Sequence, residues 1–108
     1  IKEGNKMIAI TRLTSLKNND GLTLKNGEII TYKSGWQVAT EGMQTTSPKV
    51  AMVMIKLYKG NCGIWFSEGI YYIDKSHRVS TKREALIIGR ECNQISVLNW
   101  RTMGLAYC

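Results

Sequence analysis

The sequence predicts an α+β fold: an antiparallel β-sheet, formed by a meander and a hairpin, with two helices packed on one face. Short β-branched or alternating runs are separated by tight turns of Asn, Asp and Gly, and two other stretches carry helix-capping residues and helically spaced apolar residues. The chain has 108 residues, so residues 1–108 are expected to form a single domain with one core. A small β-barrel with peripheral helices is the alternative architecture.

The first third of the chain predicts a meander of strands. Residues 7–16 are rich in β-branched side chains and indicate a strand. Residues 22–25 and 28–33 flank the dipeptide Asn26-Gly27, which is a strong hairpin signal between two such runs. Residues 36–40 alternate in polarity and predict the next strand.

A first helix is predicted after residue 47. Ser47 can accept hydrogen bonds from the first turn as an N-cap, and Pro48 suits the first helical position. Gly60 is expected to end the segment in a left-handed conformation. The apolar positions predicted to face the sheet are Val50, Ala51, Val53, Met54, Leu57 and Tyr58.

A hairpin, a second helix and a last strand follow. Residues 62–66 and 70–73 surround a short loop that contains glycine. Thr81 and Glu84 then form a capping-box pattern, and the helix that begins there is expected to end near Asn93. Within it, Gly89 is expected to allow close approach to the sheet. The alternating residues 94–100 predict the last strand.

Two classes of protein are disfavoured by composition and by the chain ends. No apolar run approaches the roughly 18 to 20 residues that cross a bilayer, so no membrane partner is expected. Residues 1–6 lack the apolar core of a secretory signal. The three cysteines are odd in number and contain no C-x-x-C pair, which favours reduced thiols in a cytoplasmic protein.

Cofactor and metal sites find little support. No cofactor is predicted, since the glycines do not form a phosphate-binding loop. Zinc is an alternative that would use His77 with the cysteines, but structural zinc ligands usually occur in close pairs. No metal site is therefore predicted. The three thiols are Cys62, Cys92 and Cys108.

One short segment offers an enzymatic alternative. Asp74, Ser76 and His77 combine a carboxylate, a hydroxyl and the only imidazole of the chain, and Cys62 could pair with the same histidine. Either set would suit a small hydrolase or transferase. Near neighbours on an extended strand mostly point apart, so no catalytic residue is predicted.

Positive charge is the main functional signal. The formal net charge is +7, and residues 49–90 carry eight basic and three acidic side chains. Such an excess favours an acidic partner, either nucleic acid or an acidic protein surface. Placing Lys82 and Arg83 in the first turn of a helix opposes the helix dipole, which suggests that these charges have a use. A solvated basic face without a partner remains open.

Aromatic residues on the predicted strands are the second functional signal. Outward-facing rings could stack on nucleobases, although most should lie in the core. In Tyr71-Tyr72 the two rings must point to opposite faces of the sheet, so one is expected at the surface.

The order of motifs from residue 69 to residue 100 carries a family resemblance. A hairpin strand ending in Asp74 is followed by a capped helix, then by Gly89-Arg90 and Asn93-Gln94 in a G-R-x-x-N-Q pattern before the last strand. This arrangement resembles small uncharacterised proteins of bacteriophages and other mobile elements. The resemblance implies an accessory protein that acts in the host cytoplasm and has no assigned reaction. Small proteins of this kind often inhibit host defence, anti-CRISPR proteins included.

The sequence therefore predicts a non-enzymatic binding protein, a monomer or homodimer. It would engage nucleic acid, or a host defence protein that handles nucleic acid, through a basic face. A structural or assembly role is a further alternative, and Arg90, Asn93 and Gln94 also have purely structural interpretations. The predicted binding residues are Lys75, His77, Arg78, Lys82, Arg83, Arg90, Asn93 and Gln94.

Overall fold

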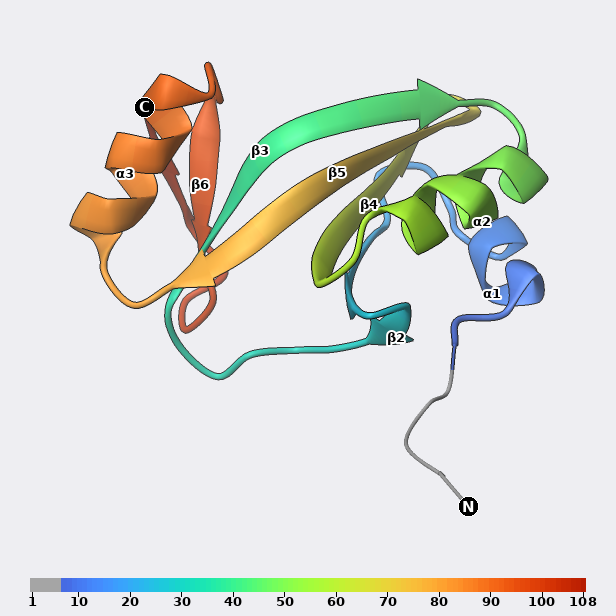
Figure 1. Cartoon of the computed structure of the whole chain (residues 1–108), viewed down its shortest axis with the longest axis horizontal. Helices are drawn as coiled ribbons and strands as arrows, with labels where there is room; N and C mark the ends of the chain where they lie inside the picture. The colour runs from blue at the N-terminus through green and yellow to red at the C-terminus, as the bar shows by residue number, and fades with distance from the viewer. Residues whose placement is uncertain (1–6) are drawn as a thin grey trace.

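The structure, a computed structural model, describes residues 7–108. Within that range, seven strands form one sheet and three helices accompany it (Figure 1). Residues 1–6, in which no secretory signal was expected, lie outside the described residues. In chain order the elements are α1 (Ile10–Thr14), β1 (Gly21–Lys25), β2 (Glu28–Ile29), β3 (Trp36–Thr45), α2 (Pro48–Leu57), β4 (Asn61–Ser67), β5 (Ile70–Val79), α3 (Lys82–Glu91), β6 (Ser96–Asn99) and β7 (Leu105–Tyr107).

The predicted α+β class is confirmed. The sheet has the order β2-β1-β4-β5-β3-β6-β7, and its strand pairs are antiparallel. On β5, Tyr71 and Ile73 join the core under α2, and Val79 packs in the core under α3. Since residues two apart share a face of a strand, both helices cover the same side of the sheet, which we call the helix face. The other side is the open face.

Both predicted hairpin turns are present, but the strands continue differently from the predicted meander. Asn26 and Gly27 have φ values of 52° and 83°, as a two-residue hairpin loop requires. β2 ends at Ile29, and β3 pairs with β5 and β6 instead of continuing the hairpin. The chain between them, seen along the lower edge of Figure 1, crosses from one end of the sheet to the other.

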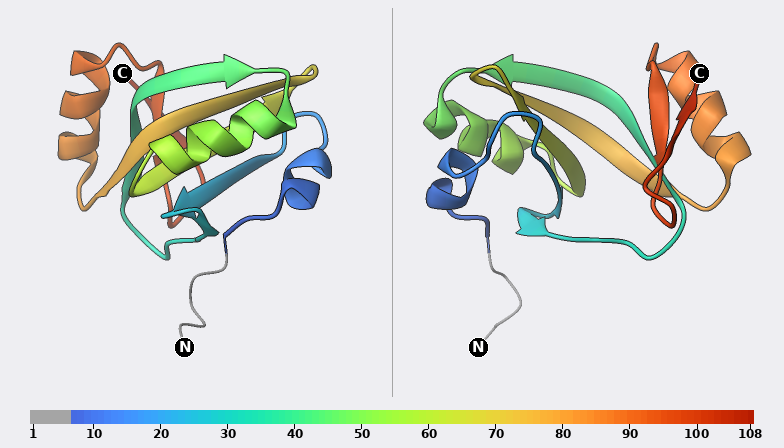
Figure 2. Two further views of the ribbon diagram at one scale, coloured as in Figure 1. Left: turned by 45° about the vertical axis from the view of Figure 1, so that its right-hand side comes forward. Right: turned by 180° about the vertical axis from the view of Figure 1, so that it is seen from behind.

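The sheet is bent along its length. A β-bulge between Ala39 and Glu41 interrupts the pairing of β3 with β5, and bulges increase local twist and bending. β6 and β7 consequently stand at a steep angle to the long strands in all three views (Figures 1 and 2). This bend makes the open face concave.

Helix starts match the sequence prediction. The Ser47 hydroxyl accepts the N–H of Val50 at 3.2 Å, and the Thr81 hydroxyl accepts the N–H of Glu84 at 3.1 Å. The Thr81 hydroxyl also lies 2.9 Å from a Glu84 carboxylate oxygen, so this cap uses both side chains. α3 ends at Glu91, close to the predicted end, and Asn93 follows it with a φ of 56°.

The predicted inner face of α2 is correct at Ala51 and Tyr58 but wrong at other positions. Ile55 is buried, with 2% of its surface exposed, and packs with Ala51 and Tyr58 in the core. Val53 and Leu57, predicted to face the sheet, point outward and are 56% and 67% exposed. The helix is apolar on more than one side, so its own pattern did not specify which side would find a partner.

The predicted strand at residues 7–16 is also wrong, because the segment contains α1. Leu13 and Leu16, three residues apart, are buried together, and the Tyr71 hydroxyl donates to the Leu13 carbonyl at 3.3 Å. β1 already pairs with β2 on one side and β4 on the other. Tertiary packing therefore overrides the weak β propensity of this segment.

The core has two parts instead of the single core that was expected. One cluster lies between α1, α2 and the strands β1, β4 and β5, and the other lies under α3. As predicted, Gly89 allows α3 to approach the sheet closely. A Cβ there would lie 2.7 Å from the Cys108 Sγ, 3.2 Å from Val97 and 3.7 Å from Val38. Within residues 7–108, no helix has the length and apolar character needed to cross a membrane.

Candidate binding sites on α3 and on the open face

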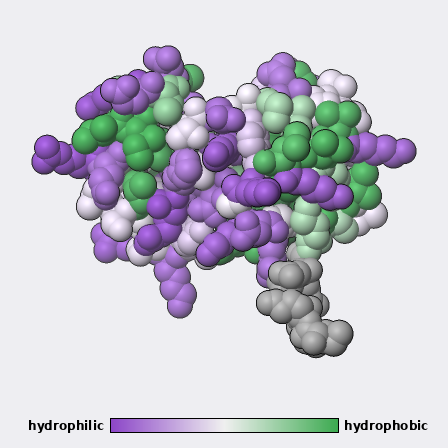
Figure 3. Space-filling view, viewed as in Figure 1, coloured by the Kyte–Doolittle hydropathy of each residue, from purple (hydrophilic) through white to green (hydrophobic). Residues whose placement is uncertain are grey.

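Three of the predicted binding residues gather on the outward side of α3. Lys82, Arg83 and Arg90 line an open hollow of about 580 Å³ together with Leu86 and Ile87. Each of these five residues lies three, four or seven positions from another of them, so they lie on one side of the helix. We call them the α3 outer face. In Figure 3, apolar side chains over α3, at the left, are bordered by hydrophilic ones.

The formal charges on the α3 outer face are all positive. Its three cations are exposed, and Glu84, the acidic residue of the first turn, is engaged with Thr81 at the helix start. Ile87, in the middle of the surface, is 53% exposed. The arrangement is an apolar centre bordered by positive charge.

Lys75 and His77 lie on the same side of the sheet as α3. In the strand pairing Lys75 stands opposite Glu41 and Cys62, and His77 stands opposite Val38. Since Cys62 and Val38 belong to the cores under the helices, both basic residues belong to the helix face.

Arg78 does not share that side. Its Nε donates to the Ser34 carbonyl at 3.0 Å, and its Cζ lies 5.5 Å from the centre of the Tyr32 ring. A Cβ on Gly35, whose φ is 92°, would lie 2.8 Å from the guanidinium. Arg78 therefore fastens the segment between β2 and β3 to the open face, and the predicted single basic face is divided by the sheet.

Asn93 and Gln94 lie just after the C-terminal end of α3. Asn93 adopts the left-handed conformation, and the Gln94 N–H donates to the Gly89 carbonyl at 2.8 Å. The Gln94 side chain donates to the Cys92 carbonyl at 3.3 Å. These contacts support the structural interpretation of both residues.

The structure does not assemble the enzymatic alternatives. Asp74 and Ser76 lie on the open face, whereas His77 lies on the helix face. The Cys62 thiol is buried in the core, and burial, followed by the charge of Asp74, raises its pKa to about 12. Among residues 7–108, no three His, Cys, Asp or Glu side chains come close enough together to hold a metal ion.

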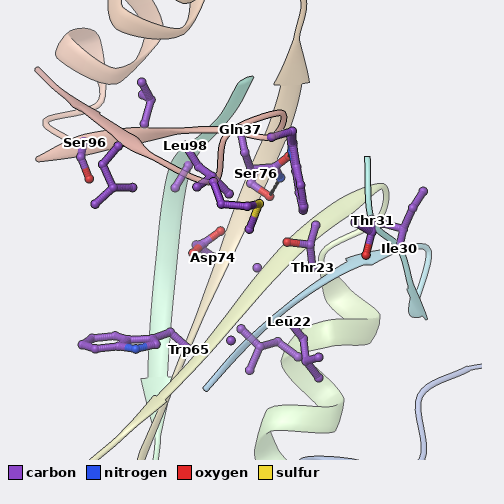
Figure 4. Close-up of a pocket in the computed structure, with 18 of the residues that line it drawn as sticks. Leu22, Thr23, Ile30, Thr31, Gln37, Trp65, Asp74, Ser76, Ser96 and Leu98 are labelled. Carbon is purple, nitrogen blue, oxygen red and sulfur yellow. Dashed lines mark hydrogen bonds between the residues drawn. The ribbon is translucent and has the colours of Figure 1, made fainter. Parts of the chain in front are cut away.

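The open face holds a groove that the sequence did not reveal. It has a volume of about 860 Å³ and lies between the β1–β2 end and the β6–β7 end of the bent sheet (Figure 4). Lining side chains that Figure 4 labels include Thr23, Gln37, Trp65, Asp74, Ser76 and Leu98.

A hydrogen-bonded chain of side chains stiffens one end of the groove. The Gln37 amide donates to the Ser76 hydroxyl at 2.5 Å, and the Trp100 indole N–H donates to the Gln37 carbonyl oxygen at 2.9 Å. Ser76 is 2% exposed, so its hydroxyl needs such a partner.

Asp74 is the titratable group of the groove. Burial raises its pKa from 3.8 to about 6, and a hydrogen bond from the Gly63 N–H opposes this shift. Gly63 and Gly42 stand directly opposite Asp74 on the two neighbouring strands. Glycine inside a strand marks close approach of another group, and these two glycines are the sequence signal that could have found the site.

Comparisons with protein-family models, with curated proteins and with solved structures find no match for this chain.

Proposed function

We propose that the protein is a non-enzymatic binding protein that holds an acidic surface of a partner protein against the α3 outer face. The observation that carries the proposal is the exposed Ile87 surrounded by Lys82, Arg83 and Arg90. Protein interfaces commonly combine an apolar centre with a polar rim, and arginine is enriched in them. A site for phosphates alone needs the cations but not the apolar centre.

The position of the cations supports a binding role. Lys82 and Arg83 occupy the first turn of α3, where positive charge opposes the helix dipole at a cost of a few tenths of a kcal/mol each. Acidic residues there would instead favour the helix. The family resemblance adds the hypothesis that the partner is a host defence protein, which would make the chain a counter-defence protein of a mobile element.

Charge reversal on α3 tests the proposal. The variant Lys82→Glu/Arg83→Glu/Arg90→Glu is expected to lose at least about tenfold of the protein capture shown by wild type in nuclease-treated bacterial lysate, which corresponds to about 1.4 kcal/mol. Quantitative mass spectrometry of the retained proteins measures the loss.

The matched control is Lys49→Glu/Lys59→Glu/Arg101→Glu, which changes the net charge equally at exposed positions elsewhere. It is expected to keep the capture of wild type. Equal losses in both variants, or none in the α3 variant, would contradict the proposal. Titration with duplex and single-stranded DNA and RNA completes the test: nucleic-acid binding that only the α3 variant loses would identify a nucleic acid as the partner.

Two of these substitutions are expected to stabilise the fold although they weaken partner binding. Lys82→Glu/Arg83→Glu should raise the free energy of unfolding by about 1 kcal/mol, because negative charge in the first turn is favourable to the helix dipole. Urea denaturation at low ionic strength measures this gain, which should shrink in high salt. A destabilised variant would refute this expectation and would leave its loss of binding open to a folding defect.

A further inference from the structure

We propose that the groove on the open face binds a small organic cation, an amine or guanidinium group carried on a flat apolar body. The cation would pair with Asp74, and the flat body would lie against Trp65. This site is separate from the α3 outer face, since it lies on the other side of the sheet.

The charge of the groove selects a cation. Of the described residues that line it, Asp74 alone carries a formal charge, in a chain whose net charge is +7. The cation closest to it in sequence, Lys75, belongs to the helix face, and the Arg78 guanidinium is engaged with Ser34 and Tyr32. A partly desolvated carboxylate in such surroundings is stabilised by a cationic ligand and repels an anionic one.

The neighbouring strands place no side chain against the carboxylate, which itself fills the space over Gly63. A Cβ on Gly63 would lie 2.7 Å from Oδ1 of Asp74, and a Cβ on Gly42 would lie 3.6 Å from the Asp74 Cβ. The two glycines therefore keep side chains away from the carboxylate on both neighbouring strands. The Gly63 N–H also donates to the carboxylate, which helps to orient it.

Trp65 offers a surface for the flat body. Trp65 follows Gly63 by two residues on β4, and Gly63 stands opposite Asp74. Trp65 therefore lies on the same face as Asp74, at the next same-face position along the strands. Its ring lies 5.1 Å from the Tyr72 ring between centroids, which supports it from one side, and the residue is 46% exposed. An exposed indole beside a carboxylate suits a ligand with a flat group and a positive charge.

The size of the groove fits a small molecule. Its volume of about 860 Å³ falls within the range of ordinary ligand pockets, which are mostly apolar with a few polar groups that orient the ligand. The Gln37–Ser76 pair supplies a fixed polar end, and Leu98 supplies apolar surface.

Three probes of one shape and different charge test the inference: tyramine, its neutral alcohol tyrosol, and its carboxylate counterpart 4-hydroxyphenylacetate. Titration is followed by backbone and indole NMR shifts at about pH 8, where Asp74 is ionised. Tyramine is expected to shift Gly63, Asp74 and Trp65, and to bind at least about tenfold more tightly than tyrosol. The carboxylate should not bind.

Two variants and a control complete the test. Asp74→Asn should remove the preference of the protein for tyramine over tyrosol. Gly63→Ala should weaken the binding of tyramine, because it places a methyl group against the carboxylate. Glu68→Gln, an exposed carboxyl at the β4–β5 turn, should bind tyramine as wild type does. NMR spectra of each variant show directly whether it is folded.

Equal affinities for tyramine and tyrosol, absence of tyramine binding, or an unchanged preference in folded Asp74→Asn would each overturn the inference. Tighter binding of a capped Gly-Arg-Gly peptide than of tyramine would also overturn it, because the cation would then be a side chain of a partner protein.

Discussion

Replacing Asp74 by asparagine is expected to stabilise the protein by about 2 kcal/mol at about pH 8 and to have little effect below about pH 4. Burial raises the pKa of Asp74 from 3.8 to about 6, so the folded state binds this proton more tightly than the unfolded state. The stabilisation that protonation provides is fully present below the unfolded pKa and is lost as the pH rises through about 6. An asparagine carries no charge to desolvate and can still accept the Gly63 N–H.

Urea denaturation of wild type and Asp74→Asn across this pH range measures the effect. Glu68→Gln removes an exposed carboxyl by the same chemical change and should show no comparable gain. A gain of similar size at both ends of the pH range would show that charge burial is not its cause. A stabilised Asp74→Asn would also show that the groove retains a carboxylate at the expense of stability, as binding sites often do.

Ile55→Ala is expected to lower the free energy of unfolding by about 3 kcal/mol, whereas Leu57→Ala should change it by less than about 0.5 kcal/mol. Ile55 packs in the core under α2, and its truncation leaves a cavity there. Leu57 is two residues further on but is 67% exposed. A domain of this size has a total stability of roughly 5–15 kcal/mol, so the first substitution should be plain in urea denaturation.

The pair of substitutions also tests the orientation of α2. If Leu57→Ala were the costly change and Ile55→Ala the mild one, the helix would face the sheet as its sequence pattern predicted. Val53→Ala is a second outward-facing control, since Val53 is 56% exposed.

Features governed by neighbouring residues could be predicted. Asn26-Gly27 adopts positive φ values within its own turn, and the caps of Ser47 and Thr81 involve atoms only three residues away. Gly89 and Asn93 belong to the same class, because a missing side chain and a left-handed terminus are local properties.

The candidate sites were predicted in part. Lys82, Arg83 and Arg90 could be placed on one side of a helix by their spacing, and the structure brings them together. Arg78 could not be separated from them, because the predicted hairpin strand ended before it. β5 in fact runs to Val79, and the alternation of the strand turns Arg78 to the open face. The groove could not be predicted either, since its lining joins residues 21–31 near one end of the sheet to residues 94–105 near the other end.

The sequence by itself determined the antiparallel α+β class, both tight hairpins, the start of each long helix and the excess of positive charge. Tertiary structure alone decided that residues 7–16 contain a helix, that Ile55 faces inward in place of Leu57, and that β3 pairs with β5. The physical reason is range: turns and caps are satisfied within a few residues, whereas burial depends on the shape of partners that are distant in the chain.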